Sequence, residues 1–191
     1  MKLGVLTSHG GSLIQSAVIA GVDLKVIICN NRNANAFHRA MELDVPAVHL
    51  SNTTHPDADA LDQAINDTLQ WHGCDFVLLA GYMKRLGATT LDAYSGRIIN
   101  SHPSLLPKFG GKGFYGRRVH EAVITAGDTE SGITIHFVDG EYDTGKIIQQ
   151  LTVPVYPNDS AETLEARVKE KEVPFLAVSY THLTLPTNRE V

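Results

Sequence analysis

The chain has 191 residues, of which 43% are hydrophobic, and its formal net charge is −5 at pH 7. This length suits one domain with a full core, and the acidic balance argues against a nucleic-acid partner or a membrane surface. Cys29 and Cys74 show no metal-binding spacing and predict reduced thiols, and no signal peptide or membrane-spanning run is visible. We therefore expect a cytoplasmic protein.

Apolar runs and helical periods alternate along the first half of the chain. Strands are predicted at 2–7, 24–29, 47–50, 76–80 and 97–101, and helices at 13–20, 34–43 and 57–71. In the last of these helices Leu61, Ile65 and Leu69 recur every four residues, which is a helical period. The alternation predicts an α/β fold, with a mostly parallel central sheet and helices on both faces.

The second half of the chain changes character. Residues 132–138 and 147–155 predict two neighbouring antiparallel strands, joined by a loop that carries the acidic residues. Residues 160–176 predict a helix, with Asp159 or Ser160 as its N-cap.

The segment after Val178 shows no helical period. It resembles translated read-through of a sequencing adapter. We therefore expect a domain of residues 1–177 followed by a non-native tail at 178–191. This predicts that residues 179–191 pack poorly and that Leu183 and Leu185 are not buried.

The segment NSHPSLLP at 100–107 is the clearest functional signal in the chain. It directly follows the apolar run 97–99, so Asn100 and His102 alternate along a strand and point to the same side. In open α/β sheets, ligands bind at the carboxyl ends of the strands. A carboxamide can stabilise an oxyanion and an imidazole can move a proton, so the pair predicts a catalytic site.

Three separated segments together resemble the folate-dependent formyltransferases. They are NSHPSLLP at 100–107, GITIHFVD at 132–139 and DTGKII at 143–148, in the order and spacing of that family. Within the family, the chain is most similar to the enzymes of purine biosynthesis that act on glycinamide ribonucleotide. The resemblance implies a Rossmann-like formyltransferase fold. It also implies formyl transfer from the co-substrate 10-formyltetrahydrofolate to the amine of the ribonucleotide, with no metal.

The resemblance implies that Asn100, His102 and Asp143 are catalytic. The carboxylate of Asp143 would pair with His102 and raise the pKa of that imidazole. Asp139 competes for this role, but the pattern DxGxII matches Asp143. His136 is interpreted as a structural group beside the site. A metal site built from His102, His136, Asp139 and Asp143 is compatible with the residue types, but the local spacing matches no metal motif.

A glycine-rich loop separates the first strand from the first helix, and it consists of Gly10, Gly11, Ser12 and Leu13. Glycines let a ligand approach the backbone, and free amides at a helix start attract anions. The resemblance implies that this loop binds the substrate phosphate, with Leu13 where the family usually has Asn. It also assigns Lys169 and Glu172 to the phosphate and ribose. From the residues alone, these two are a solvated charge pair on one helix face.

Two segments are expected to form the folate pocket. A flat pterin needs apolar walls and a few backbone hydrogen bonds. The resemblance assigns this role to Met83, Lys84, Arg85 and Leu86, and to Val138, Asp139, Gly140 and Glu141. Asp139 and Glu141 are expected mainly to shape their loop. The remaining histidines are expected at the surface: His38, His55, His72 and His120.

Other functions share parts of this pattern. The acceptor could be a nucleotide-sugar amine or methionyl-tRNA, although tRNA enzymes of the family add a second domain and this chain is acidic. Hydrolysis of the formyl folate would use water as the acceptor, in enzymes that usually carry a regulatory domain. A folate-binding module without activity is the non-enzymatic alternative. The phosphate loop favours a phosphorylated acceptor, and a monomer or homodimer is expected.

Overall fold

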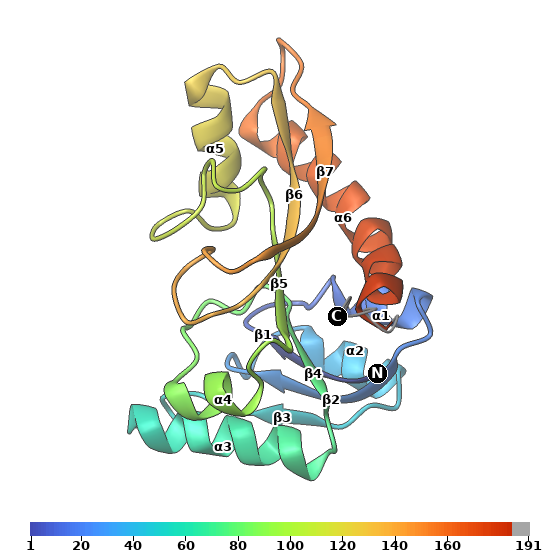
Figure 1. The fold of residues 1–191 in the computed structure, drawn as a ribbon, viewed down its shortest axis with the longest axis vertical. Helices are drawn as coiled ribbons and strands as arrows, with labels where there is room; N and C mark the ends of the chain where they lie inside the picture. The colour runs from blue at the N-terminus through green and yellow to red at the C-terminus, as the bar shows by residue number, and fades with distance from the viewer. Residues whose placement is uncertain (185–191) are drawn as a thin grey trace, which may run out of the picture.

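The structure is a computed structural model, and it describes residues 1–184. The strands of this part are β1 Lys2–Thr7, β2 Asp23–Cys29, β3 Ala47–His49, β4 Phe76–Leu79, β5 Ile98–His102, β6 Glu130–Phe137 and β7 Ile147–Pro154. They form one sheet in the order β3-β2-β1-β4-β5-β6-β7 (Figure 1). The first five strands are parallel, whereas β6 is antiparallel to β5 and β7 to β6. The predicted sheet, including its antiparallel pair, is therefore confirmed.

The helices of residues 1–184 are α1 Ile14–Ile19, α2 Ala36–Glu42, α3 Ala58–Trp71, α4 Ala88–Ala93, α5 Arg117–Ala126 and α6 Ala161–Thr184. The sequence predicted α1, α2, α3 and most of α6, but α4 and α5 were not predicted. The start of α4 depends on a tertiary contact, because the Asp62 carboxylate on α3 accepts hydrogen bonds from the backbone N–H groups of Gly87 and Thr90.

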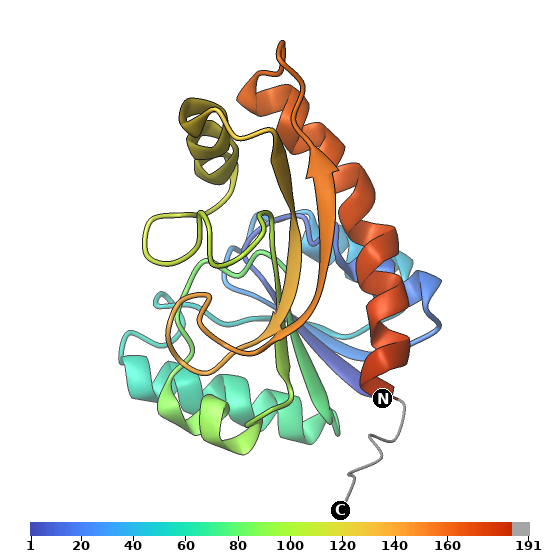
Figure 2. The same ribbon diagram turned by 45° about the horizontal axis from the view of Figure 1, so that its top comes forward.

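The helices cover both faces of the sheet. α1, α2 and α6 lie on one face, and α3 and α4 lie on the other (Figures 1 and 2). Along β1, Leu3 and Val5 point into the first layer and Leu6 into the second, as the two-residue period of a strand requires. Because both faces are covered, the central strands are apolar throughout.

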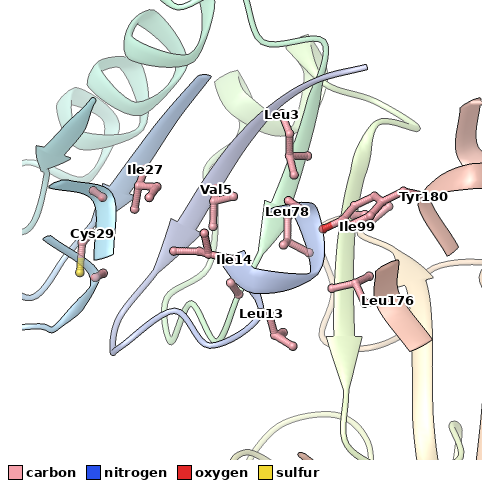
Figure 3. Close-up of a cluster of buried hydrophobic side chains, with 14 of the residues drawn as sticks. Leu3, Val5, Leu13, Ile14, Ile27, Cys29, Leu78, Ile99, Leu176 and Tyr180 are labelled. Atoms are coloured by element: carbon pink, nitrogen blue, oxygen red, sulfur yellow. The ribbon is translucent and has the colours of Figure 1, made fainter. Parts of the chain in front are cut away.

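One core cluster joins the N-terminal half of the chain to its C-terminal helix. Ile14 of α1 and Tyr180 of α6 are at most 1% exposed and lie over strand residues such as Ile99 (Figure 3). The Tyr180 hydroxyl also lies 3.2 Å from Oγ of Ser16 on α1. Full burial of a large side chain of this kind stabilises the fold by about 1.5–3 kcal/mol.

The C-terminal helix continues beyond its predicted end. α6 runs to Thr184. Ser179 and Tyr180 are 0% and 1% exposed, and Leu183 packs partly buried against the same cluster. The expectation that the chain packs poorly from residue 179 is therefore wrong up to Leu183, whereas Leu185 lies outside the described residues. The domain boundary at residue 177 stays a prediction.

The carboxyl ends of β1, β4 and β5 lie at one edge of the sheet. Side chains at the end of β1 join it to the segment after β4: the Thr7 hydroxyl donates to the carbonyl of Ala80 at 2.8 Å, and Oγ of Ser8 accepts from the amide of Met83 at 2.8 Å. This edge carries the predicted site. No helix within residues 1–184 is long and apolar enough to cross a bilayer.

Candidate active site

Asn100 and His136 face each other on neighbouring strands. They are register partners on β5 and β6, and Nδ2 of Asn100 lies 3.1 Å from Nε2 of His136. Nδ1 of His136 lies 2.8 Å from the carbonyl oxygen of Phe137. Because a carbonyl only accepts, the His136 proton resides on Nδ1 and the Asn100 amide donates to Nε2. The Asn100 amide is therefore held by a buried ring.

His102 and Asp143 form the second contact of the site. Nδ1 of His102 lies 3.4 Å from Oδ2 of Asp143, and Oδ1 of Asp143 lies 3.5 Å from Nε2 of His136. The other His102 nitrogen, Nε2, donates to the carbonyl oxygen of Phe109 at 2.8 Å. The structure thus brings the three predicted catalytic residues, Asn100, His102 and Asp143, together around His136.

The loop between β6 and β7 delivers Asp143 to this place. Asp143 has a φ of 58°, and its Oδ2 accepts a hydrogen bond from the Gly111 amide at 2.9 Å. Gly145 packs so tightly on the end of β6 that a Cβ there would lie 1.7 Å from the carbonyl oxygen of Phe137. The glycine therefore allows the loop to fold back toward β5.

The site stabilises an ionised carboxylate beside a neutral imidazole. Burial lowers the pKa of His102 below its ordinary value, although the Asp143 carboxylate and the Phe109 carbonyl oppose this shift. Burial alone would raise the pKa of Asp143, but the imidazolium forms of His136 and His102 and the hydrogen bond from the Gly111 amide lower it overall. The expectation that Asp143 gives His102 a raised pKa is therefore wrong, because desolvation outweighs the charge interaction. The His102–Asp143 pair can take up one proton, and this proton binds Nδ1 of His102 because Nε2 already carries one.

The predicted phosphate loop follows β1. Gly11 has a φ of 61°, and a Cβ there would lie 2.5 Å from Cδ1 of Ile14, so only glycine fits without strain. Gly10 and Ser12 are at least partly exposed, whereas the Leu13 side chain is 6% exposed and lies in the core cluster beneath α1 and α6. Leu13 can therefore offer a ligand only its backbone.

The two residues predicted on α6 have different surroundings. Nζ of Lys169 lies 2.5 Å from Oε1 of Glu165 and is exposed. Glu172 is 9% exposed and accepts a 2.6 Å hydrogen bond from Oγ of Ser101. The interpretation of Lys169 and Glu172 as a solvated charge pair is therefore wrong, because Glu172 turns inward to the strand that carries Asn100.

The two predicted folate segments meet beside the site. Nη2 of Arg85 donates to the Gly140 carbonyl at 2.5 Å and to Oε1 of Glu141 at 3.2 Å. Asp139 shapes its loop, because its Oδ1 accepts from the Thr144 hydroxyl at 2.9 Å. These segments border an open hollow of ≈ 460 Å³, lined by Arg85, Lys112, Glu141, Tyr142 and Thr144.

Not every predicted folate residue faces this hollow. Leu86 is 9% exposed and belongs to the core beneath α3 and α4, and Val138 packs against the same cluster. Met83 is 41% exposed. Among the described residues no group of three or more His, Cys, Asp and Glu side chains is arranged to hold a metal ion.

A sequence model of the family described as Formyl transferase matches residues 2–179. The chain belongs to this family. It is 42% identical to the chloroplastic phosphoribosylglycinamide formyltransferase of Vigna unguiculata over 90% of its own length and 57% of that relative. It is 38% identical to the phosphoribosylglycinamide formyltransferase of Haemophilus influenzae, over 90% of this chain and 81% of that one.

Solved structures of formyl transferase family members share the fold. The phosphoribosylglycinamide formyltransferase of Streptococcus pneumoniae superimposes with a TM-score of 0.88 at 34% identity, covering 96% of this chain and 99% of that one. The predicted formyltransferase fold is thereby confirmed. The chain spans somewhat more than half the length of the Vigna unguiculata relative.

Several contacts in this family member were not predicted from the sequence. The interaction of His136 with both Asn100 and Asp143 depends on the β5–β6 register, which no motif encodes. His120, expected at the surface, is 2% exposed between α5 and its neighbours, and its Nδ1 has no hydrogen-bond partner in residues 1–184. The apolar neighbours Val119 and Val123 on α5 were the available signal that this face is buried.

Proposed function

We propose that the protein transfers a formyl group from 10-formyltetrahydrofolate to the amine of glycinamide ribonucleotide, as a step of purine biosynthesis. The observation that carries this proposal is the convergence of Asn100, His102 and Asp143 around His136. The glycine loop follows β1 and Arg85 of the hollow follows β4, and the two segments are joined by the hydrogen bond from the Met83 amide to Ser8. The names of the formyl transferase relatives support the same reaction.

In the proposed reaction the amine nitrogen of the ribonucleotide attacks the formyl carbon, and a tetrahedral oxyanion forms. Asn100 donates to this oxygen with the N–H that His136 does not use. The carbon–N10 bond of the folate then breaks, so the formyl group stays on the ribonucleotide amine.

Proton balance requires one proton to leave the amine and one to reach N10 of the folate. His102 accepts the first proton and delivers the second, while Asp143 stabilises the intermediate imidazolium. The neutral resting state of His102, which follows from its lowered pKa, fits the role of proton acceptor. Nδ1 of His102, beside Asp143, accepts the amine proton, and Nε2–H, which donates to the Phe109 carbonyl in the resting site, must leave that contact before it can donate to N10 of the folate.

Binding roles follow the same layout. The backbone of Gly10, Gly11, Ser12 and Leu13 holds the phosphate, and Lys169 and Glu172 hold the phosphate and ribose of the acceptor. Met83, Lys84, Arg85 and Leu86, with Val138, Asp139, Gly140 and Glu141, form the folate side. In this assignment Leu86 and Val138 act as the apolar base of the pocket, since both pack in the apolar cluster under α3 and α4.

Mixing the purified protein with 10-formyltetrahydrofolate, with and without glycinamide ribonucleotide, tests the proposal. Deformylated folate is followed by its absorbance. Release that requires the ribonucleotide supports the transferase. Release of equal rate without the ribonucleotide would instead indicate hydrolysis, and folate binding without release would indicate a binding module.

A further inference from the structure

Ser101 lies between Asn100 and His102 on β5, and its side chain points to the opposite face of the sheet. There its Oγ donates a 2.6 Å hydrogen bond to Oε1 of Glu172 on α6. Both residues are 9% exposed. The strand that carries the catalytic candidates is therefore joined directly to a buried carboxylate on the C-terminal helix.

Glu172 has few other partners. Within residues 1–184 its carboxylate makes no further hydrogen bond, and the nearby cation, Lys169, pairs with Glu165. Burial raises the pKa of Glu172, and the Ser101 hydrogen bond and the charge of Lys169 oppose this rise. One carboxylate oxygen is thus held by Ser101, and the other remains free to accept hydrogen bonds.

Stability does not explain this arrangement. A buried carboxylate with one hydrogen bond costs free energy, and an apolar side chain of similar size in such a place is often neutral or stabilising. Glu172 also lies one helical turn from Leu176, which shares a core cluster with Leu13 of the glycine loop. The helix α6, which carries Glu172, packs against α1, the helix that directly follows the glycine loop.

We propose that Ser101 is a positioning residue for the acceptor: its hydroxyl fixes the Glu172 carboxylate so that the free oxygen receives the ribose hydroxyls. This rests on the proposed function, in which Glu172 contacts the ribose. Because Ser101 is the chain neighbour of both Asn100 and His102, the contact joins the acceptor side of the site to the strand that carries the catalytic side chains.

The variant Ser101→Ala tests this role. We expect the KM and Kd for glycinamide ribonucleotide to rise about tenfold, the loss typical of a hydrogen bond to a charged group. At saturating ribonucleotide, kcat and the KM for the folate remain close to the wild-type values. Ser101→Thr, which keeps the hydroxyl, restores tight binding. Ser131→Ala is the matched control, because Ser131 is a buried serine of β6 whose Oγ has no partner among the described residues.

A ribonucleotide analogue that lacks both ribose hydroxyls shows whether Ser101 acts on ribose binding or only on the structure of the site. With that analogue, wild-type protein and Ser101→Ala should show equal KM values. Glu172→Gln should raise the ribonucleotide KM, and adding Ser101→Ala to it should have little further effect. Calorimetry gives Kd for each variant independently of turnover.

Three outcomes would overturn the inference. They are an unchanged ribonucleotide KM in Ser101→Ala, an equal loss with the analogue, and a failure of Ser101→Thr to restore binding. If the wild-type protein formylates the ribonucleotide and any of these occurs, only the inference fails. If the wild-type protein does not use the ribonucleotide, the proposed function fails and the inference with it.

Discussion

Asn100 and His136 are held face to face on β5 and β6, with 3.1 Å between Nδ2 of the amide and Nε2 of the ring. Since Nδ1 of His136 is committed to the Phe137 carbonyl, the ring can only accept from Asn100. The amide oxygen of Asn100 therefore points away from His136, and one amide N–H remains for a substrate oxygen. A residue that the sequence indicated only as structural thus orients the proposed oxyanion donor.

Replacing His136 tests this orienting role. His136→Phe keeps a ring but removes the acceptor, so we expect kcat to fall about tenfold, the value of one lost hydrogen bond, while the Kd for folate changes little. In a double-mutant cycle with Asn100→Ala, the two losses should be far from additive, because both act through the same amide. His55→Phe, in a loop away from the site, is the control. Additive losses would contradict the account.

The pKa of His102 gives a prediction for the pH dependence. Burial lowers it below the ordinary value of 6.5, so the acid limb of kcat/KM should have its midpoint below pH 6.5. The Asp143 carboxylate raises the pKa of His102, so Asp143→Asn should move the imidazole midpoint to still lower pH. An NMR titration of His102, assigned by loss of its signal in His102→Asn, measures both. A midpoint above 6.5, or an upward shift in Asp143→Asn, would refute the electrostatic description.

The buried imidazole of His120 should make the folded protein less stable at acidic pH. Burial lowers its pKa from 6.5 to about 4, so the unfolded chain binds more protons than the folded one between these values. The free energy of unfolding is therefore unaffected by the protonation of His120 above pH 6.5. It decreases as the pH falls from 6.5 toward 4, by about 3 kcal/mol at most. Urea unfolding at several pH values measures this loss.

The variant His120→Leu should flatten that pH dependence without a large cost at neutral pH, since Nδ1 of His120 has no hydrogen-bond partner to lose within residues 1–184. His38→Leu is the control, because the His38 side chain is 60% exposed. If His120→Leu keeps the full acid dependence, other groups are responsible for it.

Tyr180 tests the packing of the last turns of α6. Tyr180→Ala should reduce the free energy of unfolding by about 3–5 kcal/mol, because it leaves a cavity in the core beside α1. Tyr180→Phe should cost about 1 kcal/mol, the value of the hydrogen bond with Ser16. Val178→Ala, at a side chain that is 56% exposed, should have little effect. Equal stability of Tyr180→Ala and wild type would show that this part of the helix does not pack against the core.

The sheet could be predicted from the sequence because each central strand is a short apolar run. The missed elements depend on tertiary contacts. α4 begins where Asp62 accepts from the amides of Gly87 and Thr90, and this contact joins residues far apart in the chain. α6 continues past Pro174 because Leu176 and Tyr180, spaced by one helical turn, both enter the core.

The candidate site was predicted as a set of residues but not as a set of contacts. The motif around Asn100 and His102 indicated the chemistry, whereas the hydrogen bond from Ser101 to Glu172 requires knowledge of how α6 crosses β5. The direction of the His102 pKa was predicted wrongly, because the cost of burying the ring is not encoded in the motif. The inward turn of Leu13 likewise depends on the packing of α1 against α6.

The central claim is that Asn100 and His102 act on the formyl group itself. Transfer of a carbon-13-labelled formyl group to glycinamide ribonucleotide, followed by mass spectrometry, tests it with the wild-type protein, Asn100→Ala and His102→Ala. We expect labelled ribonucleotide from the wild type, a fall in kcat of about 10²–10³ in Asn100→Ala, and a comparably large fall in His102→Ala, with folate Kd nearly unchanged in both. Turnover near the wild-type level in either variant would contradict the account.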